Sequence, residues 1–361
     1  MGSRIRPVRL VVAAVAAGAL LGPALAGCSG SPQDPPASGA SAQLVLVTHD
    51  SFALSDGVLD AFTSETGIAV DVVALGDAGE LVNKLVLTKD SPLGDVVFGI
   101  DNTFASRAVD AGVLLDYVST ALTAAEAPYL LPAGQGGEQL TPVDSGDVCV
   151  NVDHEWFAER GLAEPATLED LADPAYRDLL VVESAATSSP GLAFLLATVA
   201  AFGEGGWQDY WRALIGNGVK IDAGWTDAYY ADFSGPSSDG ERPLVVSYSS
   251  SPPVEVVDPA APSPTGVLTA TCFRQTEYAG VLAGTAWPEA AQRLVDFLLS
   301  PTVQQDLPGS MYVYPVVAGT PLPETWAAHA VRIEDPYGLD PAEIGASRER
   351  WIQEWAAIVD R

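Results

Sequence analysis

The chain has 361 residues, of which 48% are hydrophobic and 18% charged, a composition typical of a globular protein large enough for two lobes. Its 17 Lys and Arg residues against 47 Asp and Glu residues give a formal net charge of −30 at pH 7. Such a charge repels phosphate backbones and anionic lipid headgroups, so we do not expect nucleic acid as a partner. The acidity fits a secreted surface kept soluble by carboxylates, and it equally fits attraction of a cation.

The first 27 residues predict an export signal. Three arginines, Arg4, Arg6 and Arg9, precede an Ala/Val/Leu run over 10–26 that is short for a membrane span. The run ends in LAGC, which resembles the lipobox of bacterial lipoproteins, where Cys28 would be diacylated and become the new N-terminus. A plain secretory signal with an incidental cysteine is the alternative. Residues 28–42, rich in Pro, Ser and Gly, predict a flexible tether to the outer face of the cytoplasmic membrane.

The next segments alternate between strand and helix. An apolar run bounded by turn formers predicts a buried strand over 43–49. Similar runs predict strands over 68–75 and 94–100. The helical spacing of Val58, Leu59 and Phe62 predicts a helix over 58–66, and a short helix over 79–87 is expected after the GDAG turn. This order predicts an α/β lobe with a mainly parallel sheet, whose ligand sites lie in the loops after the strands. An acidic residue recurs in each of these loops, HDSF (49–52), GDAG (76–79) and DN (101–102).

A second α/β set follows. Residues 179–183 predict a strand and 192–202 a buried helix, with Ser189 as its N-cap and Pro190 in its first turn. Capping explains one serine but not the pair in TSSPG, so the second hydroxyl could bind an anion or a ligand hydroxyl. A strand over 243–247 also ends in polar residues. The helix that begins at Pro341 is predicted only to pack.

Two cysteines remain after Cys28, namely Cys149 and Cys272. Export would bring them into a compartment where disulfides persist, so we predict that they pair. Two separate buried thiols are the alternative.

The common catalytic and metal-binding motifs do not occur in the sequence. The histidines, His49, His154 and His329, are too scattered for a zinc cluster, and there is no H-E-x-x-H, C-x-x-C, G-x-S-x-G or Walker A motif. We interpret the DSG at 144–146 as a turn. The sequence therefore predicts neither an enzyme, nor a cofactor, nor a metal site, although a cell-surface hydrolase remains a distant alternative.

The segment GWTDAYY (224–230) leaves one metal alternative open. Adjacent tyrosines with a histidine and a carboxylate suit a hard trivalent cation, and such a set is available in the sequence: Tyr229, Tyr230, His49 and Glu80. A ferric-ion-binding receptor is therefore the second hypothesis.

Several longer segments resemble the thiamine-binding periplasmic proteins, which are solute-binding components of ABC importers. They occur in the family's order: THDSFA (48–53), VALGDAGELVNKL (73–85), DVVFGIDN (95–102), TSSPGL (187–192), GWTDAY (224–229), VVSYSSSP (245–252), YVYPV (312–316) and PAEIGASRERWIQEW (341–355). Each match alone is weak, but the ordered set extends from about residue 43 to the C-terminal helix.

The resemblance implies a set of ligand-binding residues drawn from both lobes: Asp77, Ala78, Ser188, Ser189, Trp225, Tyr248, Ser249, Ser250, Ser251, Pro252 and Tyr312. Ser188 and Ser189 would meet the hydroxyethyl or phosphate end of thiamine, and Trp225 would stack on a ring. The chain departs from the family at two positions, because Ala78 replaces an expected glycine and Tyr312 an expected tryptophan.

The resemblance also implies the fold and the function. The fold would be the two-lobed, type II periplasmic-binding-protein-like α/β fold, with two mixed, mainly parallel sheets joined by hinge strands. The first lobe would comprise 43–145 and 273–315, and the second 146–272 and 316–361. The protein would be a monomer that captures thiamine or its mono- or diphosphate and delivers it to an ABC permease and ATPase. Cys149 and Cys272 would then lie on segments that cross between the lobes.

Overall fold

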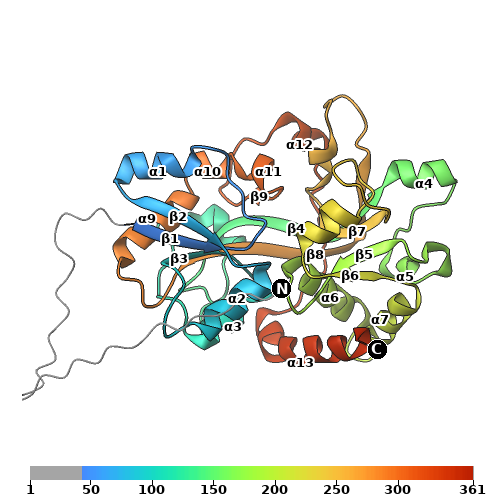
Figure 1. Ribbon diagram of the computed structural model, residues 1–361, viewed down its shortest axis with the longest axis horizontal. Coiled ribbons are helices and arrows are strands. Elements are labelled where there is room, and N and C mark those ends of the chain that lie inside the picture. The colour runs from blue at the N-terminus through green and yellow to red at the C-terminus, as the bar shows by residue number, and fades with distance from the viewer. Residues whose placement is uncertain (1–42, 361) are drawn as a thin grey trace, which may run out of the picture. The chain divides into compact units, whose positions relative to one another are not determined.

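The strands form one mixed sheet in the order β2-β1-β3-β8-β4-β7-β5-β6, with β9 paired to β4 (Figure 1). This computed structural model describes residues 43–360. The predicted signal peptide, the predicted tether and Cys28 therefore lie outside the described residues.

The first part of the sheet is parallel and is covered by the helices that connect its strands. β1 (Gln43–Thr48) lies between β2 (Ala69–Ala74) and β3 (Val96–Asp101) and pairs with both in parallel. α1 (Val58–Thr66) and α2 (Ala78–Leu87) connect these strands. Alternate residues of β1 and β3 pack into two different hydrophobic clusters, one with α1 and the other with α2. Burial on both faces explains why these strands read as continuous apolar runs.

Two long antiparallel strands connect the first part of the sheet to the second part. β4 (Thr141–Asp153) pairs with β7, whereas β8 (Thr265–Val281) pairs with β3, and the two strands pair with each other along most of their length. The interpretation of 144–146 as a turn is wrong, because these residues lie inside the buried strand β4. The predicted lobe boundaries at 145/146 and 272/273 fall within these two strands.

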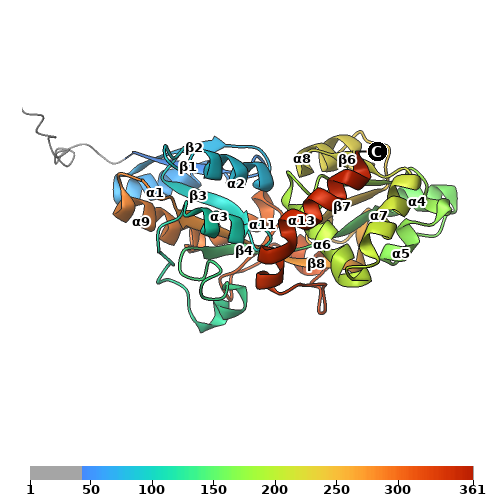
Figure 2. The same ribbon diagram turned by 90° about the horizontal axis from the view of Figure 1, so that it is seen from below.

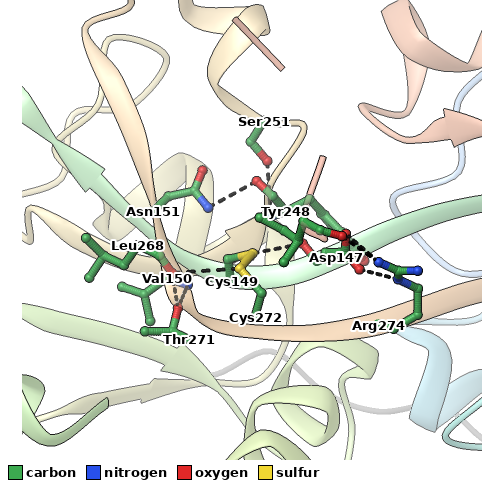
Figure 3. Close-up of a disulfide and its surroundings, with 11 residues drawn as sticks. Asp147, Cys149, Val150, Asn151, Tyr248, Ser251, Leu268, Thr271, Cys272 and Arg274 are labelled. Atoms are coloured by element: carbon green, nitrogen blue, oxygen red, sulfur yellow. Dashed lines mark hydrogen bonds and ion pairs between the residues drawn. A yellow bond between two sulfur atoms is a disulfide. The ribbon is translucent and has the colours of Figure 1, made fainter. Parts of the chain in front are cut away.

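The disulfide between Cys149 and Cys272 joins β4 to β8 (Figure 3). Both cysteines are buried. The covalent link therefore lies on the two strands that connect the parts of the sheet.

The second part of the sheet repeats the parallel arrangement. β5 (Leu180–Glu183) lies between β6 (Lys220–Asp222) and β7 (Leu244–Tyr248). α6 (Ser189–Phe202) is apolar on nearly all sides because it packs on the sheet and against α7 (Trp207–Gly216). Ser188, not the predicted Ser189, occupies the N-cap position of α6. The backbone of Ser188 is extended, and the helix begins one residue later.

The C-terminal helix α13 (Pro341–Val359) contacts both parts of the structure (Figure 2). Asp340 caps it, since the Asp340 side chain accepts a hydrogen bond from the backbone N–H of Ala342. α13 packs on α7 and also on α3 (Ala105–Ala111), where the buried Arg348 donates to the carbonyl of Thr103. α13 therefore ties the two parts together outside the sheet.

Short elements complete the described chain: Ala124–Tyr129, α4 (His154–Arg160), α5 (Leu168–Leu171), Pro174–Tyr176, α8 (Trp225–Asp227), Ala228–Asp232, Pro252–Glu255, α9 (Pro288–Leu298), α10 (Pro301–Gln304), α11 (Leu307–Ser310), β9 (Tyr314–Pro315) and α12 (Glu324–His329). Within residues 43–360, no helix has the length and apolar character needed to cross a membrane.

Candidate ligand-binding site

A cavity of about 270 Å³ lies where the loops of both parts of the sheet meet. From the first part it is lined by residues after β1, at the start of α2, on β8 and after α11: His49, Asp50, Ser51, Phe52, Ala53, Asp77, Ala78, Glu277, Ser310, Met311, Tyr312 and Val313. From the second part it is lined by Ser189, Pro190, Trp225, Thr226, Tyr230 and Tyr248. This is the edge of the sheet where the parallel strands end, the expected ligand position in an open α/β sheet.

Aromatic rings form one wall of the cavity, defined here as Trp225, Tyr230, Tyr248 and Tyr312. The Trp225 ring lies edge-on to Tyr230 and Tyr312, with ring centroids 5.3 and 6.2 Å apart, and is tilted against Tyr248 at 6.5 Å. One indole face is already covered, since Tyr229 stacks on it at 4.9 Å. A π-rich wall of this kind attracts a flat cationic ligand through its ring faces.

Polar contacts hold the aromatic wall in position. The indole Nε1 of Trp225 donates to Ser247 Oγ at 2.9 Å, and the hydroxyl of Tyr230 donates to that of Tyr312 at 3.1 Å. Tyr312 has a φ of 60°, in the left-handed region that side chains rarely adopt. Its carbonyl oxygen accepts a hydrogen bond of 2.6 Å from Ser250 Oγ. This contact helps to maintain an unfavourable backbone conformation at the rim of the cavity.

Asp77 links the start of α2 to the second part of the structure. One carboxylate oxygen, Oδ1, accepts from the backbone N–H of Ala78 at 2.6 Å and of Ser189 at 3.1 Å, and Oδ2 accepts from the N–H of Trp225 at 3.0 Å. A Cβ added at Gly224 would lie 2.9 Å from Oδ2, so glycine permits this close approach. Burial raises the pKa of Asp77, although the N–H groups of Trp225 and Ser189 oppose that rise.

A carboxylate–imidazole pair forms the floor of the cavity. His49 Nε2 lies 3.6 Å from Glu277 Oε1, and the side chains of both residues are buried. Burial disfavours the imidazolium, but the Glu277 carboxylate, assisted by Asp77 and Asp50, outweighs burial and raises the pKa of His49. The imidazolium form is therefore stabilised by the surrounding acids.

Glu277 also belongs to a row of three carboxyl groups on neighbouring strands of the sheet. Glu277 on β8 is directly opposite Asp101 on β3 and opposite Asp144 on β4; we call these three residues the acid row. Burial raises the pKa of Asp101 to about 6. Burial and the facing Glu277 carboxyl raise the pKa of Asp144 well above its usual range. Asp101 and Asp144 therefore hold more protons than exposed carboxyl groups would. Glu277 is the member of the acid row that lines the cavity, and its carboxylate makes the floor electronegative.

The sequence profile described as "Bacterial extracellular solute-binding protein" matches residues 91–333. The chain belongs to this family.

This solute-binding protein is 29% identical to the thiamine-binding periplasmic protein of Escherichia coli K12, over 88% of its own chain and 94% of the relative. A solved periplasmic thiamin binding protein superposes with a TM-score of 0.77 at 27% identity, over 90% of this chain and 98% of the other. The ferric binding protein from Campylobacter jejuni has a TM-score of 0.67 at 17% identity, over 87% and 99% of the chains, and shows the fold alone. The predicted two-lobed, type II periplasmic-binding-protein-like fold is confirmed. Its strands are hydrogen bonded into one continuous sheet.

The cavity of the solute-binding protein brings together six residues of the predicted ligand-binding set: Asp77, Ala78, Ser189, Trp225, Tyr248 and Tyr312. Five members of the predicted set do not line the cavity: Ser188, Ser249, Ser250, Ser251 and Pro252. All five are buried. Ser250 and Ser251 lie behind the aromatic wall, where Ser250 contacts Tyr312 and Ser251 Oγ lies 2.9 Å from Ser247 Oγ. Their role as direct ligand contacts stays a prediction.

The structure divides the predicted ferric set: His49 and Tyr230 line the cavity, whereas Tyr229 and Glu80 do not. Tyr229 is buried outside the cavity, with its hydroxyl donating to Glu255 at 2.8 Å, and Glu80 lies 3.3 Å from Lys84. Within residues 43–360, no group of three or more His, Cys, Asp or Glu side chains is arranged to hold a metal ion. The full set of four is therefore not assembled, and a ferric receptor of the same fold stays the alternative hypothesis.

Sequence reasoning missed Glu277 altogether and considered His49 only as an iron ligand. The signal for His49 was present, because the residue lies in the loop directly after a predicted strand, where ligand sites are expected. For Glu277 there was no local signal. It lies in the middle of a long strand, and only the pairing of β8 with β3 and β4 brings it to the cavity floor.

Proposed function

We propose that this solute-binding protein captures thiamine, or its mono- or diphosphate, in the cavity and delivers it to an ABC permease and ATPase. The observation that carries the proposal is the union of an aromatic wall with an electronegative floor in one cavity. The relatives named for thiamine support the choice of ligand. In this role the protein binds and releases its ligand without a cofactor and without making or breaking a covalent bond.

The chemistry of thiamine matches the two surfaces. Its thiazolium ring carries a permanent positive charge, and its aminopyrimidine is flat. Aromatic rings attract a cation by about 0.5 to 2 kcal/mol each, more when water is excluded. Glu277 at the floor adds charge complementarity in a region from which much of the water is displaced. Several such contacts suffice for a micromolar to nanomolar site, which requires about −8 to −12 kcal/mol.

Capture would occur by closure of the two lobes around the ligand. Contacts that span the cavity are available for the closed form: Asp77 to the backbone of Ser189 and Trp225, and Ser51 Oγ to Thr226 Oγ1 at 3.3 Å. A ligand that touches both lobes favours this form over an open one. Asp77 would then act mainly on closure, because its oxygens already accept backbone hydrogen bonds.

The lipid anchor is a separate part of the proposal. Diacylation of Cys28 would hold a monomeric receptor at the outer face of the cytoplasmic membrane, with residues 28–42 as the tether. The acidic composition fits a soluble body beside this anchor.

One titration tests the proposed function. The purified mature protein is titrated with thiamine, thiamine diphosphate and ferric citrate while tryptophan fluorescence and visible absorbance are followed. We expect saturable quenching by a thiamine species without a visible band, because Trp225 lines the cavity. A coloured tyrosinate–iron band with no response to thiamine would overturn the proposal in favour of the ferric receptor. Turnover of an ester or phosphate substrate would instead favour the hydrolase.

A further inference from the structure

The imidazole of His49 occupies a closely defined position beside Glu277. The two side chains are 3.6 Å apart, both line the cavity, and they are only 9% and 6% exposed. On its other side the ring packs against β3, where a Cβ added at Gly99 would lie 2.2 Å from His49 Cδ2. His49 therefore has little room to move away from Glu277.

Three acids from different segments act on His49. Asp50 is adjacent in the chain, Asp77 faces it from the start of α2, and Glu277 faces it from β8. The acid row continues behind Glu277 through Asp101 and Asp144, and the phenol of Tyr248 lies near Glu277 from β7. None of the residues that line this cavity, all within 43–360, is a lysine or an arginine. When His49 is protonated, it is therefore the cation that the cavity lining itself supplies to Glu277.

We propose that protonated His49 acts as an internal counter-ion of Glu277 and that a cationic ligand displaces its proton on binding. The inference rests on the proposed function, capture of a positively charged ligand. When the ligand cation approaches Glu277, two positive charges would share one carboxylate in a site with little water. The N–H bond of the imidazolium breaks, the proton leaves for solvent, and the neutral imidazole keeps its electron pair. Glu277 then neutralises the ligand in place of His49.

The direction of the pH effect follows from proton linkage. The neighbouring carboxylates raise the pKa of His49 before the ligand arrives, whereas the ligand cation lowers it in the complex. Between these two pKa values the complex holds fewer protons than the protein and ligand apart. Affinity for the cation therefore rises with pH through this window, by at most about tenfold per pH unit, and levels off above it.

Calorimetry measures the displaced proton directly. Thiamine is titrated into the mature protein at one pH in two buffers of different ionisation enthalpy, and the difference in heat counts the protons released. The wild type is expected to release a large fraction of one proton where its affinity changes most steeply with pH, and His49→Gln none. His154→Gln is the matched control, because His154 also contacts a carboxylate, Glu164, at 2.7 Å but lies outside the cavity. It should release as many protons as the wild type.

Comparing thiamine with a neutral ligand of the same shape tests how much of the affinity depends on the ligand's positive charge. The thiophene isostere of thiamine has no ring charge, so it should bind the wild type without releasing a proton. Glu277→Gln should weaken thiamine binding at least about tenfold while changing affinity for the isostere by less than about threefold. If Glu277→Gln does not fold by circular dichroism, the proton counts of the wild type and of His49→Gln decide.

Two results would overturn the inference, and they can be told apart. Thiamine binding without proton release from about pH 5.5 to 8.5 would remove His49 from this role and leave the proposed function standing. Failure of both thiamine and its isostere to bind would overturn the function and the inference together.

Discussion

Trp225 is positioned by more of the protein than its own segment. Its indole nitrogen is bonded to Ser247, one ring face is stacked on Tyr229, and its backbone N–H is bonded to Asp77. The ring is 8% exposed, and this remaining surface lines the cavity. Because the ring is held from several sides, a ligand would meet it without much loss of side-chain freedom.

Replacing this ring should weaken binding. We expect Trp225→Ala to raise the Kd for thiamine at least tenfold, or about 1.4 kcal/mol, because a stacking surface is lost. Isothermal titration calorimetry measures the effect, and circular dichroism shows whether the variant folds. Trp156→Ala, a partly exposed tryptophan on α4, is the matched control and should bind as the wild type does. An unchanged Kd for Trp225→Ala would exclude Trp225 from the site.

Asp101 makes a specific prediction about stability and pH. Its buried carboxyl accepts hydrogen bonds from the backbone of Thr103 and Phe104, yet burial raises its pKa from 3.8 to about 6. The folded state then holds this proton to a higher pH than the unfolded state. The Asp101 contribution to stability is therefore greatest below about pH 4 and is lost as pH rises through about 6.

The variant Asp101→Asn lacks this titration. The free energy of unfolding of the wild type minus that of the variant should fall by about 3 kcal/mol between about pH 3.5 and 7. Urea denaturation at a series of pH values measures this difference, with Asp110→Asn, an exposed acid on α3, as the matched substitution. A difference that grows with pH would mean that the surrounding donors stabilise the ionised form.

Individual site residues were predictable from the sequence only where they follow a strand. Asp77, Ser189 and Trp225 lie at the start of a helix that follows a strand, Tyr248 is the last residue of β7, and all four line the cavity. Ser250 and Ser251 belong to the same sequence motif as Tyr248 but lie behind the wall. A motif identifies a loop near the ligand, and the direction of each side chain depends on how the loop packs.

At the scale of elements, β4 and β8 decide how the two parts of the structure are joined. Both strands are largely buried, they pair antiparallel over most of their length, and the disulfide links them 123 residues apart in the chain. A cross-link that closes so long a loop constrains the unfolded chain strongly. It does not bridge the cavity, so it leaves closure of the lobes free.

Removing the disulfide should therefore affect stability more than binding. We expect the double variant Cys149→Ala/Cys272→Ala to lose about 2 to 5 kcal/mol of unfolding free energy, because the unfolded chain regains its freedom. Its Kd for thiamine should change by less than about threefold. Urea denaturation and calorimetry measure the two quantities, and unreduced wild-type protein is the reference. A large loss of affinity with little loss of stability would assign the disulfide to the site.

Local sequence patterns predicted most of the helices and strands, but they did not predict the pairing of β4 with β8 that joins the two parts of the structure. The strands at the start of the chain were predicted within one or two residues because each is an apolar run between turn formers, and α1 because its apolar residues have helical spacing. The interior of β4 contains DSG, which has the composition of a turn. It is a strand because β8 and β9 hydrogen bond to it from both sides, and that pairing is invisible to local propensity.

At the scale of the whole molecule, charge and shape act together on the ligand. The formal net charge of −30 creates a negative field at long range, and Glu277 places a carboxylate at the cavity floor. Such a field raises the rate at which a cation reaches the site more than it slows departure.

The association rate for thiamine should therefore depend on salt. Between about 20 and 500 mM NaCl we expect it to fall several-fold, because the Debye length shortens, while the dissociation rate changes little. Stopped-flow tryptophan fluorescence measures both rates, and the neutral thiophene isostere is the control, whose association rate should change by less than about twofold. Equal salt dependence for both ligands would show that the field of the protein does not steer capture.

The sequence alone determined the α/β class, the segments that carry the cavity-lining residues Trp225, Tyr230 and Tyr248, and the acidic character of the chain. These properties are local or additive, since caps, apolar runs and charges are read residue by residue. The tertiary structure alone decided that Glu277 lies between Asp101 and Asp144, that His49 faces it, and that Asp77 joins the two parts through backbone hydrogen bonds. Register between distant strands sets these contacts, and register results from packing of the whole sheet rather than from any one segment.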